Sequence, residues 1–258
     1  DLCAVPSDCC QNSCIAGFCC VVTPCSGHVL QCNDCIDNDG DGLIDSRDPE
    51  CLGPCDNTEV PNLNADVGGE TGGPCQSDCY FDFGNGSGND NCFWDHRCDP
   101  LEVAPNYYPE GPSCEYDPSR VGTRNCPATQ SATCLGFCLP ITPNGCDCFG
   151  CCTFPALAGM GPGGTDGFVW IQHLDASGAG TCTLAAVTDP AACPPCTPVP
   201  DCINPCEACE LCVGRPTLPP GCIPGDRCEP GVQPCGQPGD ADCPADFYCI
   251  TGCCQLAP

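Results

Sequence analysis

Cysteine recurs at about one residue in seven along this chain, a density that restricts the possible folds more than any other feature. The 258 residues include 37 cysteines, 31 glycines and 31 prolines. Such a cysteine content is typical of disulfide scaffolds, and glycine and proline interrupt regular structure. Much of the apolar fraction is cysteine itself, so little remains for one large core. We therefore expect small disulfide-rich modules in series, mostly irregular, with short β-hairpins and little helix.

The cysteines also indicate a compartment. Disulfides at this density form where the environment is oxidising, so we expect a secreted protein or one on a cell surface. No apolar run approaches the roughly 18 residues of a membrane span, and we expect no membrane insertion. Because 37 is odd, at least one cysteine is free, metal-bound, modified, or paired with its counterpart in a second copy.

The sharpest chemical motif is an acidic loop, C-I-D-N-D-G-D-G-L-I-D-S-R-D-P-E-C, from Cys35 to Cys51. Its aspartates follow the spacing of an EF-hand calcium loop, with Gly42 at the turn position, and supply the hard oxygens that Ca²⁺ prefers. The expected Ca²⁺ ligands are Asp37, Asp39, Asp41, the carbonyl of Leu43, Asp45 and Asp48. The alternative is an acidic, solvated turn.

Two details of the loop indicate weak, structural binding. The last ligand is Asp48 rather than glutamate, and the shorter side chain makes bidentate ligation harder. We therefore expect a Ca²⁺ dissociation constant in the range of extracellular modules, about 10⁻⁴–10⁻³ M. Cysteine precedes the loop, and Pro49 and Cys51 close it, so we expect disulfides rather than EF-hand helices around it.

Residues 37–51 resemble a thrombospondin type 3 repeat and the D-x-D-x-D-G loops of many secreted bacterial surface proteins. The D-N-D-G-D-G-L-I-D…D-P-x-C form among Cys-rich segments is similar to uncharacterised secreted proteins of myxobacteria and other environmental bacteria. The resemblance covers about 15 of the 258 residues. It implies structural calcium and an extracellular setting, and nothing about catalysis.

A second, weaker candidate lies in D-F-G-N-G-S-G-N-D-N, which fits no standard calcium loop. A turn-rich loop is the alternative to a metal site there. The oxygen donors that it offers are Asp82, Asn85, Ser87, Asn89 and Asp90, with Asp78 and Asp95 nearby. Asn85-Gly86-Ser87 is also the only N-glycosylation sequon in the chain.

The run Cys206-x₂-Cys209-x₂-Cys212 has the spacing of an iron–sulfur or zinc motif. Among so many other cysteines, and without a matching histidine, we expect these three to form disulfides.

Composition and cysteine spacing divide the chain into seven expected segments. They are an N-terminal cysteine module (1–31), the calcium loop (32–55), an extended linker (56–74), a Cys-rich module (75–152), a β-hairpin segment (153–192), a Cys/Pro-rich module (193–234) and a C-terminal cysteine module (235–258). The two end modules resemble one another, because C-I-A-G-F-C-C from Cys14 has an echo in C-I-T-G-C-C from Cys249. This indicates a degenerate repeat with both ends held in place, and the N-terminal spacing is also similar to knottin-like mini-domains.

The best strand signal is F-V-W-I-Q-H-L from Phe168 to Leu174. A turn at 175–180 and a second β-rich run at 181–188 predict a hairpin with a long loop. Four consecutive apolar residues, 168–171, require cover on both faces of the strand. Another part of the chain or a neighbouring copy could provide that cover.

The charge excludes several classes of partner. The net charge is −28, there is no lysine, and all six cationic side chains are arginine. Binding to nucleic acid is not expected, since the phosphate backbone requires basic surface. Aspartate outnumbers glutamate 25 to 9, which fits turns and hard-cation sites.

Few residues in the sequence are candidates for catalysis. The three histidines, at 28, 96 and 173, lie in no recognisable catalytic motif. We therefore expect that the protein is not an enzyme. The leading hypothesis is a secreted, acidic, calcium-stabilised structural protein that self-associates into an extracellular fibre (filament), surface layer or matrix. One alternative is a monomeric calcium-dependent adhesin or ligand-binding module, with glycans among its possible partners. A knottin-like toxin or inhibitor is the third.

Overall fold

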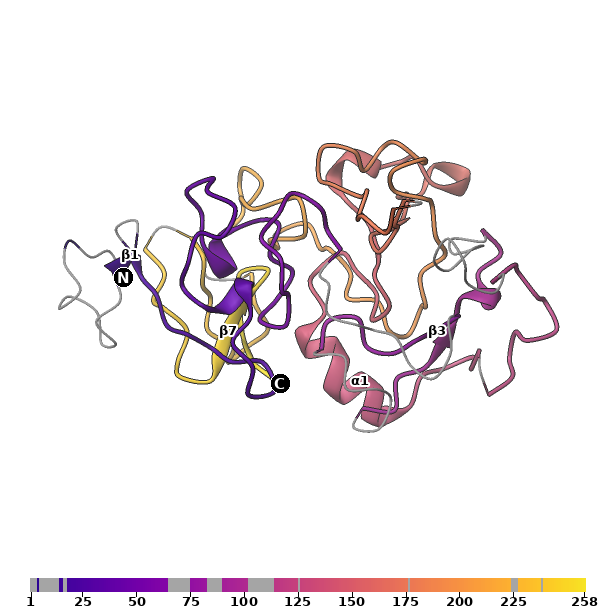
Figure 1. The fold of residues 1–258 in the computed structure, drawn as a ribbon, viewed down its shortest axis with the longest axis horizontal. Helices are drawn as coiled ribbons and strands as arrows, with labels where there is room; N and C mark the ends of the chain where they lie inside the picture. Colours follow the sequence, from indigo (N-terminus) through magenta and orange to yellow (C-terminus); the bar gives the residue numbers. More distant parts are fainter. Residues whose placement is uncertain are drawn as a thin grey trace.

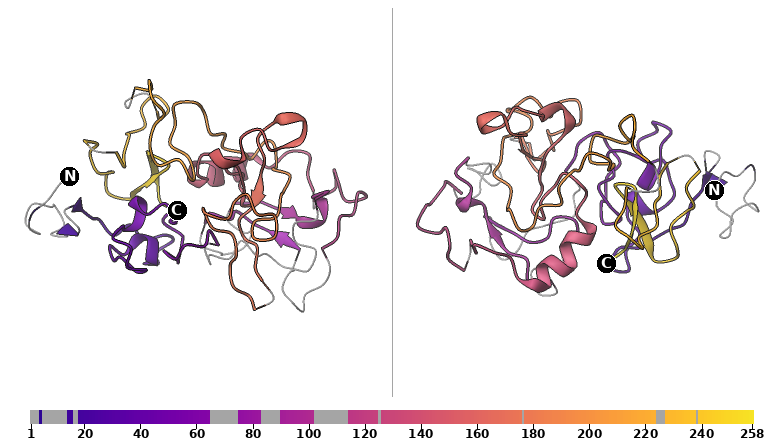
Figure 2. Two further views of the ribbon diagram at one scale, coloured as in Figure 1. Left: turned by 90° about the horizontal axis from the view of Figure 1, so that it is seen from above. Right: turned by 180° about the vertical axis from the view of Figure 1, so that it is seen from behind.

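The structure is a computed structural model that describes residues 4, 14–15, 18–64, 75–82, 90–101, 114–124, 126–175, 177–223, 227–237 and 239–258. The chain forms two lobes (Figure 1). Residues from about 20 to 60 lie beside the last thirty residues in one lobe, and the middle of the chain forms the other (Figure 2). Tyr248 Oη donates to the carbonyl of Cys32 at 2.8 Å, and Ser26 N donates to the carbonyl of Pro258 at 2.6 Å. Sequence-distant segments therefore build the first lobe together.

Regular structure is sparse, as the glycine and proline content predicts. The described residues hold one α-helix, α1 (Ala132–Cys138). They also hold four two-stranded antiparallel sheets: β1 (Cys14–Ile15) with β2 (Phe18–Cys19), β3 (Gln76–Ser77) with β4 (Trp94–Asp95), β5 (Cys151–Cys152) with β6 (Val169–Trp170), and β7 (Phe247–Ile250) with β8 (Cys253–Leu256). The 3₁₀ turns are η2 (Gln31–Asn33), η3 (Asp45–Arg47), η4 (His96–Cys98), η5 (Leu139–Ile141), η6 (Pro155–Leu157) and η7 (Pro162–Gly164). The predicted fold class is confirmed.

Sixteen disulfides join described cysteines, and they fall into consecutive sets along the chain. The sets span residues 20–55, 75–138, 146–202, 206–222 and 228–254, and none of these sixteen bonds links one set to another. Some of the bonds cross the segment boundaries expected from sequence. Cys25–Cys55 joins the expected N-terminal module to the acidic loop, and Cys151–Cys196 joins residues on both sides of the hairpin segment.

The cysteine run at 206–212 is disulfide-bonded, as expected. Cys206 pairs with Cys212, and Cys209 pairs with Cys222. Their sulfurs are therefore not available as the thiolate ligands that an iron–sulfur cluster or a zinc ion requires.

The core consists largely of these disulfides with a few large side chains among them. One cluster of buried residues extends from Cys25 in the first lobe to Ile171 in the second and returns to Ile250 in the first. Tyr80, one of the two buried tyrosines of the cluster, is 2 % exposed, and its hydroxyl donates to the carbonyl of Leu63 at 3.2 Å. Disulfides thus hold each set locally, and apolar packing joins the sets.

Helix α1 begins at a local cap. The hydroxyl of Ser131 accepts a hydrogen bond from Cys134 N at 3.0 Å, the usual way to satisfy the first backbone donors of a helix. The helix presents Cys134 and Cys138 on one face, because residues four apart share a face. Their disulfides to Cys92 and Cys79 fasten β4 and β3 to the helix.

The predicted hairpin at 168–188 forms only near its turn. Leu174 pairs with Gly180, and Asp175 N donates to the carbonyl of Ala179 at 2.9 Å. The strand β6 itself pairs with β5 instead of with residues 181–188. The segment after the turn pairs elsewhere: Thr183 bridges Asn62, and Leu63 N donates to the carbonyl of Cys182 at 2.7 Å.

The apolar strand is covered by the chain itself. Val169 and Ile171 belong to the main core, while Trp170 faces a smaller cluster around the disulfides Cys75–Cys114 and Cys151–Cys196. A neighbouring copy is therefore not needed to bury this strand.

The two ends of the chain share a hairpin register, which supports the repeat. In β1–β2 Cys14 lies opposite Cys19, and in β7–β8 Cys249 lies opposite Cys254. Each pair brackets the echoed C-I-x-G motif in the same way. The C-terminal hairpin is held against residues 20–60 by Tyr248, and most of residues 1–17 lie outside the described part of the chain.

Residues 56–64, expected to begin an extended linker, pack against the core. Leu63 is fully buried, and its N–H donates to the carbonyl of Cys182 at 2.7 Å. The signal for a linker was the absence of cysteine, which says nothing about burial of a single leucine. Residues 65–74 lie outside the described part of the chain.

Candidate calcium loop

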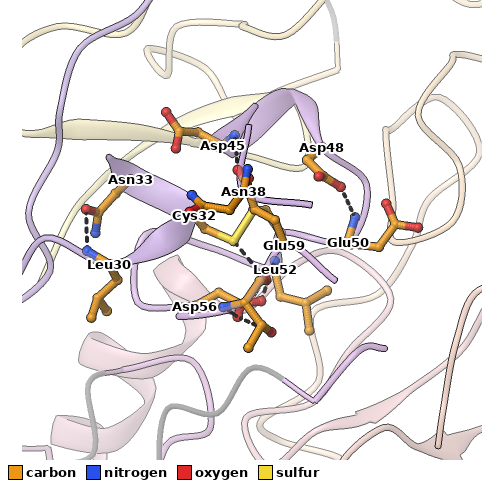
Figure 3. The surroundings of a disulfide bond; sticks show 12 residues. Leu30, Cys32, Asn33, Asn38, Asp45, Asp48, Glu50, Leu52, Asp56 and Glu59 are labelled. Atoms are coloured by element: carbon orange, nitrogen blue, oxygen red, sulfur yellow. Dashed lines mark hydrogen bonds between the residues drawn. A yellow bond between two sulfur atoms is a disulfide. The ribbon is translucent and has the colours of Figure 1, made fainter. Parts of the chain in front are cut away.

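The acidic loop is held at both ends by disulfides. Cys20–Cys35 holds the first residue of the loop, and Cys32–Cys51 joins η2 to its last residue (Figure 3). The loop itself is irregular up to η3. The flanking helices of an EF-hand are replaced by cross-links, as the sequence predicted.

Three of the predicted ligands converge. Carboxylate oxygens of Asp37, Asp39 and Asp41 lie within 4.8 Å of one another. Asp37 is half-buried and the other two are exposed, so their face of the loop is open to solvent. Like charges this close repel one another unless a cation neutralises them.

Backbone donors fix the carboxylates in this arrangement. Asp37 accepts from Gly40 N at 2.6 Å and from Gly42 N at 3.0 Å. Asp41 accepts from Leu43 N at 2.7 Å. Both glycines have positive φ, 86° and 98°, which lets the chain reverse direction tightly around Asp37. The glycines of the motif are therefore required by the turn.

Asp45 does not join this group. Its carboxylate is buried and accepts from Cys35 N, with distances of 3.1 and 3.3 Å to the two oxygens. Burial, followed by the nearby charge of Glu59, raises the pKa of Asp45 to about 7. The structure thus uses Asp45 to hold the start of the loop to its end.

Asp48 combines burial with incomplete hydrogen bonding. Its Oδ1 accepts from Glu50 N at 2.8 Å, while its Oδ2 is buried and has no hydrogen-bond partner (Figure 3). Burial raises the pKa of Asp48 to about 8, with contributions from Glu50 and Asp41. Asp48 is near enough to Asp41 to feel its charge, and a cation bound between them would satisfy the unpartnered oxygen.

Glu59 was not predicted from sequence, yet it closes the loop. It is 0 % exposed, and its two oxygens accept from Asn38 N at 2.6 Å and from Asp45 N at 2.8 Å (Figure 3). Burial raises its pKa. Glu59 lies fourteen residues after Asp45, in a stretch without cysteine, and nothing local in the sequence marks it.

The second predicted site is described only in part. Asp82 and Asp90 are fully buried, whereas Asn85, Ser87 and Asn89 lie outside the described residues. The glycosylation sequon at Asn85 lies outside as well.

A cavity of about 300 Å³ opens beside the calcium loop, lined by residues from 43–53, 211–216 and 236–252 together with Pro143. Leu43, Asp48 and Leu52 line one side of it, and Leu211, Ile250 and Gly252 line the other. Most of these side chains are apolar, so the cavity is better suited to an apolar group than to an ion.

Comparisons with protein-family models, with curated proteins and with solved structures find no match to this chain. None of the helices in the described part has the length and hydropathy that a membrane span requires. The disulfide content is consistent with a secreted or extracellular protein.

Proposed function

We propose that this chain is a secreted, non-enzymatic structural protein whose acidic loop is closed by Ca²⁺. One observation carries the proposal: carboxylate oxygens of three loop aspartates converge within 4.8 Å. The buried Asp48 oxygen without a hydrogen-bond partner, on the same loop, adds to it. Ca²⁺ takes six to eight oxygen ligands in flexible geometry, which such a loop can supply with carbonyls and water. Asp37, Asp39, Asp41 and Asp48 are the proposed side-chain ligands.

A structural role fits the way the loop is built. Disulfides and Glu59 hold it at its ends, and neither end is a long helix that could swing when the ion binds. A cation there stabilises one conformation and is not coupled to an obvious moving element. The protein therefore uses calcium as a cross-link, together with its disulfides.

Substitution of Asp41 tests the loop. Asp41→Ala removes a central ligand, and we expect calorimetric titration with Ca²⁺ to lose the heat of this site. Asp175→Ala is the matched control, because Asp175 also accepts backbone N–H groups in an exposed turn. Binding by Asp41→Ala that equals binding by the control variant would mean that the loop is only an acidic turn.

The wider part of the proposal is assembly into an extracellular fibre, surface layer or matrix. Disulfides recur from residue 20 to residue 254, which suits a protein that must resist mechanical stress. The apolar strand at 168–171 is covered by the chain itself, so it gives no support to contact with a neighbouring copy. Negative-stain microscopy of native material in millimolar Ca²⁺ should show regular polymers. A monodisperse monomer at high concentration would leave the calcium-stabilised protein without the assembly.

The cavity beside the loop favours a second candidate function, a calcium-dependent ligand-binding module. Its lining includes Asp48, so emptying the cation site would alter one wall. Binding of a hydrophobic fluorescent probe that requires Ca²⁺ and is lost in Asp41→Ala would support this function over a purely structural one.

A further inference from the structure

Three aspartates are buried together in the second lobe, far along the chain from the calcium loop. Asp78 directly follows β3, Asp82 comes four residues later, and Asp90 lies shortly before β4. Each of the three side chains is 0 % exposed. Carboxylates are among the side chains least often buried completely, and those that are buried are normally paired.

The cluster is held firmly in place. Disulfides join Cys79 and Cys92, which neighbour these aspartates in sequence, to the helix α1. Tyr80 N donates to the carbonyl of Cys148 at 2.8 Å, and Asp90 Oδ1 accepts from Cys92 N at 2.9 Å. The carboxylates therefore cannot easily move apart to relieve their repulsion.

The carboxylates also face one another. Oxygens of Asp82 and Asp90 lie within 4.8 Å of each other. Burial, then the charge of Asp90 and that of Asp82, raise the pKa of Asp78 to about 8. Asp82 and Asp90 are thus neighbours, and the completely buried Asp78 is near enough to feel the charge of both.

Hydrogen bonding does not account for this arrangement. Neither carboxylate oxygen of Asp78 has a hydrogen-bond partner, and Oδ2 of Asp90 has none either. The ion pairs found between described residues involve Asp95, Asp117 and Asp240, and leave Asp78 and Asp90 without a cation. The oxygens of Asp78 lie completely inside the protein, where a bound cation would satisfy them in place of a proton.

We propose that Asp78, Asp82 and Asp90 bind a second Ca²⁺ ion, independent of the one in the 37–48 loop. The donor set is entirely oxygen, which suits a hard cation. The neighbouring sulfur of Cys79 belongs to a disulfide and is not a thiolate, so zinc has no soft ligand here. Mg²⁺ normally keeps several of its water molecules, and a fully buried cluster has little room for them.

The position indicates what the ion does. Asp78 and Asp82 follow β3, while Asp90 precedes β4, so one ion joins the two chain segments where the β3–β4 ladder ends. It also ties together the residues that flank the 83–89 segment. The proposed site lies in the 75–138 disulfide set, whereas the loop lies in the 20–55 set. A substitution that abolishes one ion site therefore leaves the disulfides around the other unchanged.

Calcium titration of the oxidised, full-length protein tests the proposal, with Asp78→Asn as the principal variant. Asparagine has the shape of aspartate and lacks the charge. We expect the wild type to bind two Ca²⁺ ions and Asp78→Asn to lose one of them, with at least about a 100-fold loss of affinity at that site. Asp189→Asn, at an exposed turn, is the control and should keep both ions.

The outcomes separate this site from the calcium loop. Loss of one ion in Asp41→Ala and of the other in Asp78→Asn supports both proposals. Binding by Asp78→Asn that equals the wild type overturns the buried site and leaves the loop proposal intact. Loss in Asp78→Asn with unchanged binding in Asp41→Ala supports the buried site alone.

A measurement on the wild type guards against a variant that does not fold. Native mass spectrometry of the unmodified protein in millimolar Ca²⁺ should show two bound Ca²⁺ ions. In 25-fold excess of chelator the same protein should become cleavable near the Asp82 to Asp90 segment. A wild type that binds only one Ca²⁺ ion, the one lost in Asp41→Ala, overturns the proposal.

Discussion

At the scale of single residues, the calcium loop depends on side chains that do not touch the proposed ion. Asp45 and Glu59 are both buried, and their carboxylate oxygens accept hydrogen bonds from backbone N–H groups of the loop. These bonds offset the cost of burying charge, since a carboxylate that accepts backbone donors is partly compensated. They also fix the loop before an ion arrives, which reduces the entropy that binding must overcome.

Glu59→Gln should destabilise the protein by about 1–3 kcal/mol, because the amide group of glutamine places a donor against a buried backbone N–H. Denaturant unfolding in calcium measures the loss. Glu229→Gln, at an exposed position, provides the control and should leave stability unchanged within about 0.5 kcal/mol. Equal stability of the two variants would show that the loop closes without Glu59.

His96 makes the stability of the second lobe depend on pH. Its ring is buried against Trp170, its Nε2 lies 2.7 Å from Ser77 Oγ, and burial lowers its pKa from 6.5 to about 4, against a smaller opposing effect of Asp95. Above about pH 6.5 the ring is neutral in the folded and unfolded states alike. As the pH falls from 6.5 towards 4, only the unfolded state binds the proton, so stability is lost.

His96→Gln should therefore remove up to roughly 3 kcal/mol of acid-induced destabilisation between pH 6.5 and 4. Unfolding free energies of the wild type and variant at several pH values measure the difference in slope. His28→Gln, at an exposed histidine, is the control. Parallel pH profiles for wild type and His96→Gln would rule out this contribution.

At the scale of elements, short hairpins dock through their turns. The β7–β8 turn contains Thr251 and Gly252 with φ of 41° and 87°, the positive values that tight two-residue hairpin turns require. A Cβ on Gly252 would lie 2.6 Å from Leu211 Cδ1, so the turn packs directly against the preceding set. The hairpin is thus positioned by one glycine as well as by its disulfides.

Gly252→Ala should destabilise the protein by about 1–3 kcal/mol more than Gly231→Ala. Gly231 also has a positive φ, 97°, but a Cβ there meets nothing within 4 Å. The control therefore carries the backbone strain without the collision with Leu211. Thermal unfolding of the two variants gives the difference, and equal losses would show that the turn does not pack tightly.

The hairpin repeat also bears on the odd cysteine. The sixteen disulfides between described residues use 32 cysteines, and the remaining five are Cys3, Cys9, Cys10, Cys14 and Cys19. Cys14 and Cys19 are disulfide-bonded. Because five is odd, at least one cysteine of the N-terminal module has no intramolecular partner.

The repeat predicts which cysteine this is. In the C-terminal module Cys235 pairs with Cys249 and Cys243 pairs with Cys254. Transferring these pairs through the matching motifs joins residue 3 to 14 and residue 9 to 19, and leaves Cys10. Thiol labelling of the non-reduced protein followed by peptide mapping should place one label on Cys10. A label on Cys3 or Cys9 would contradict the repeat-based pairing.

At the scale of the whole molecule, cysteine density was enough to predict the fold class, because it limits both the core and the length of regular elements. The spacing of Asp37, Asp39 and Asp41 was enough to bring those three together, because all three lie on one short turn. Such local patterns can be interpreted without knowing what lies across the fold.

Long-range pairing could not be predicted. Many disulfide connectivities satisfy the same cysteine spacing, and the choice among them decides that β6 pairs with β5. Glu59 and Asp78 acquire their roles only when disulfides bring segments together. The sequence indicated Asp82 and Asp90 as donors with Asp78 nearby, but it could not show that all three are completely buried.

The central claim is that calcium complements the disulfides in holding this fold, and calorimetric unfolding of the oxidised protein with and without Ca²⁺ tests it most directly. With dissociation constants of about 10⁻⁴–10⁻³ M, about 10 mM Ca²⁺ should add roughly 1.4–2.7 kcal/mol of stability for each bound ion. The melting temperature should therefore rise with calcium concentration and fall again in chelator. Identical melting curves in calcium and in chelator would contradict the account.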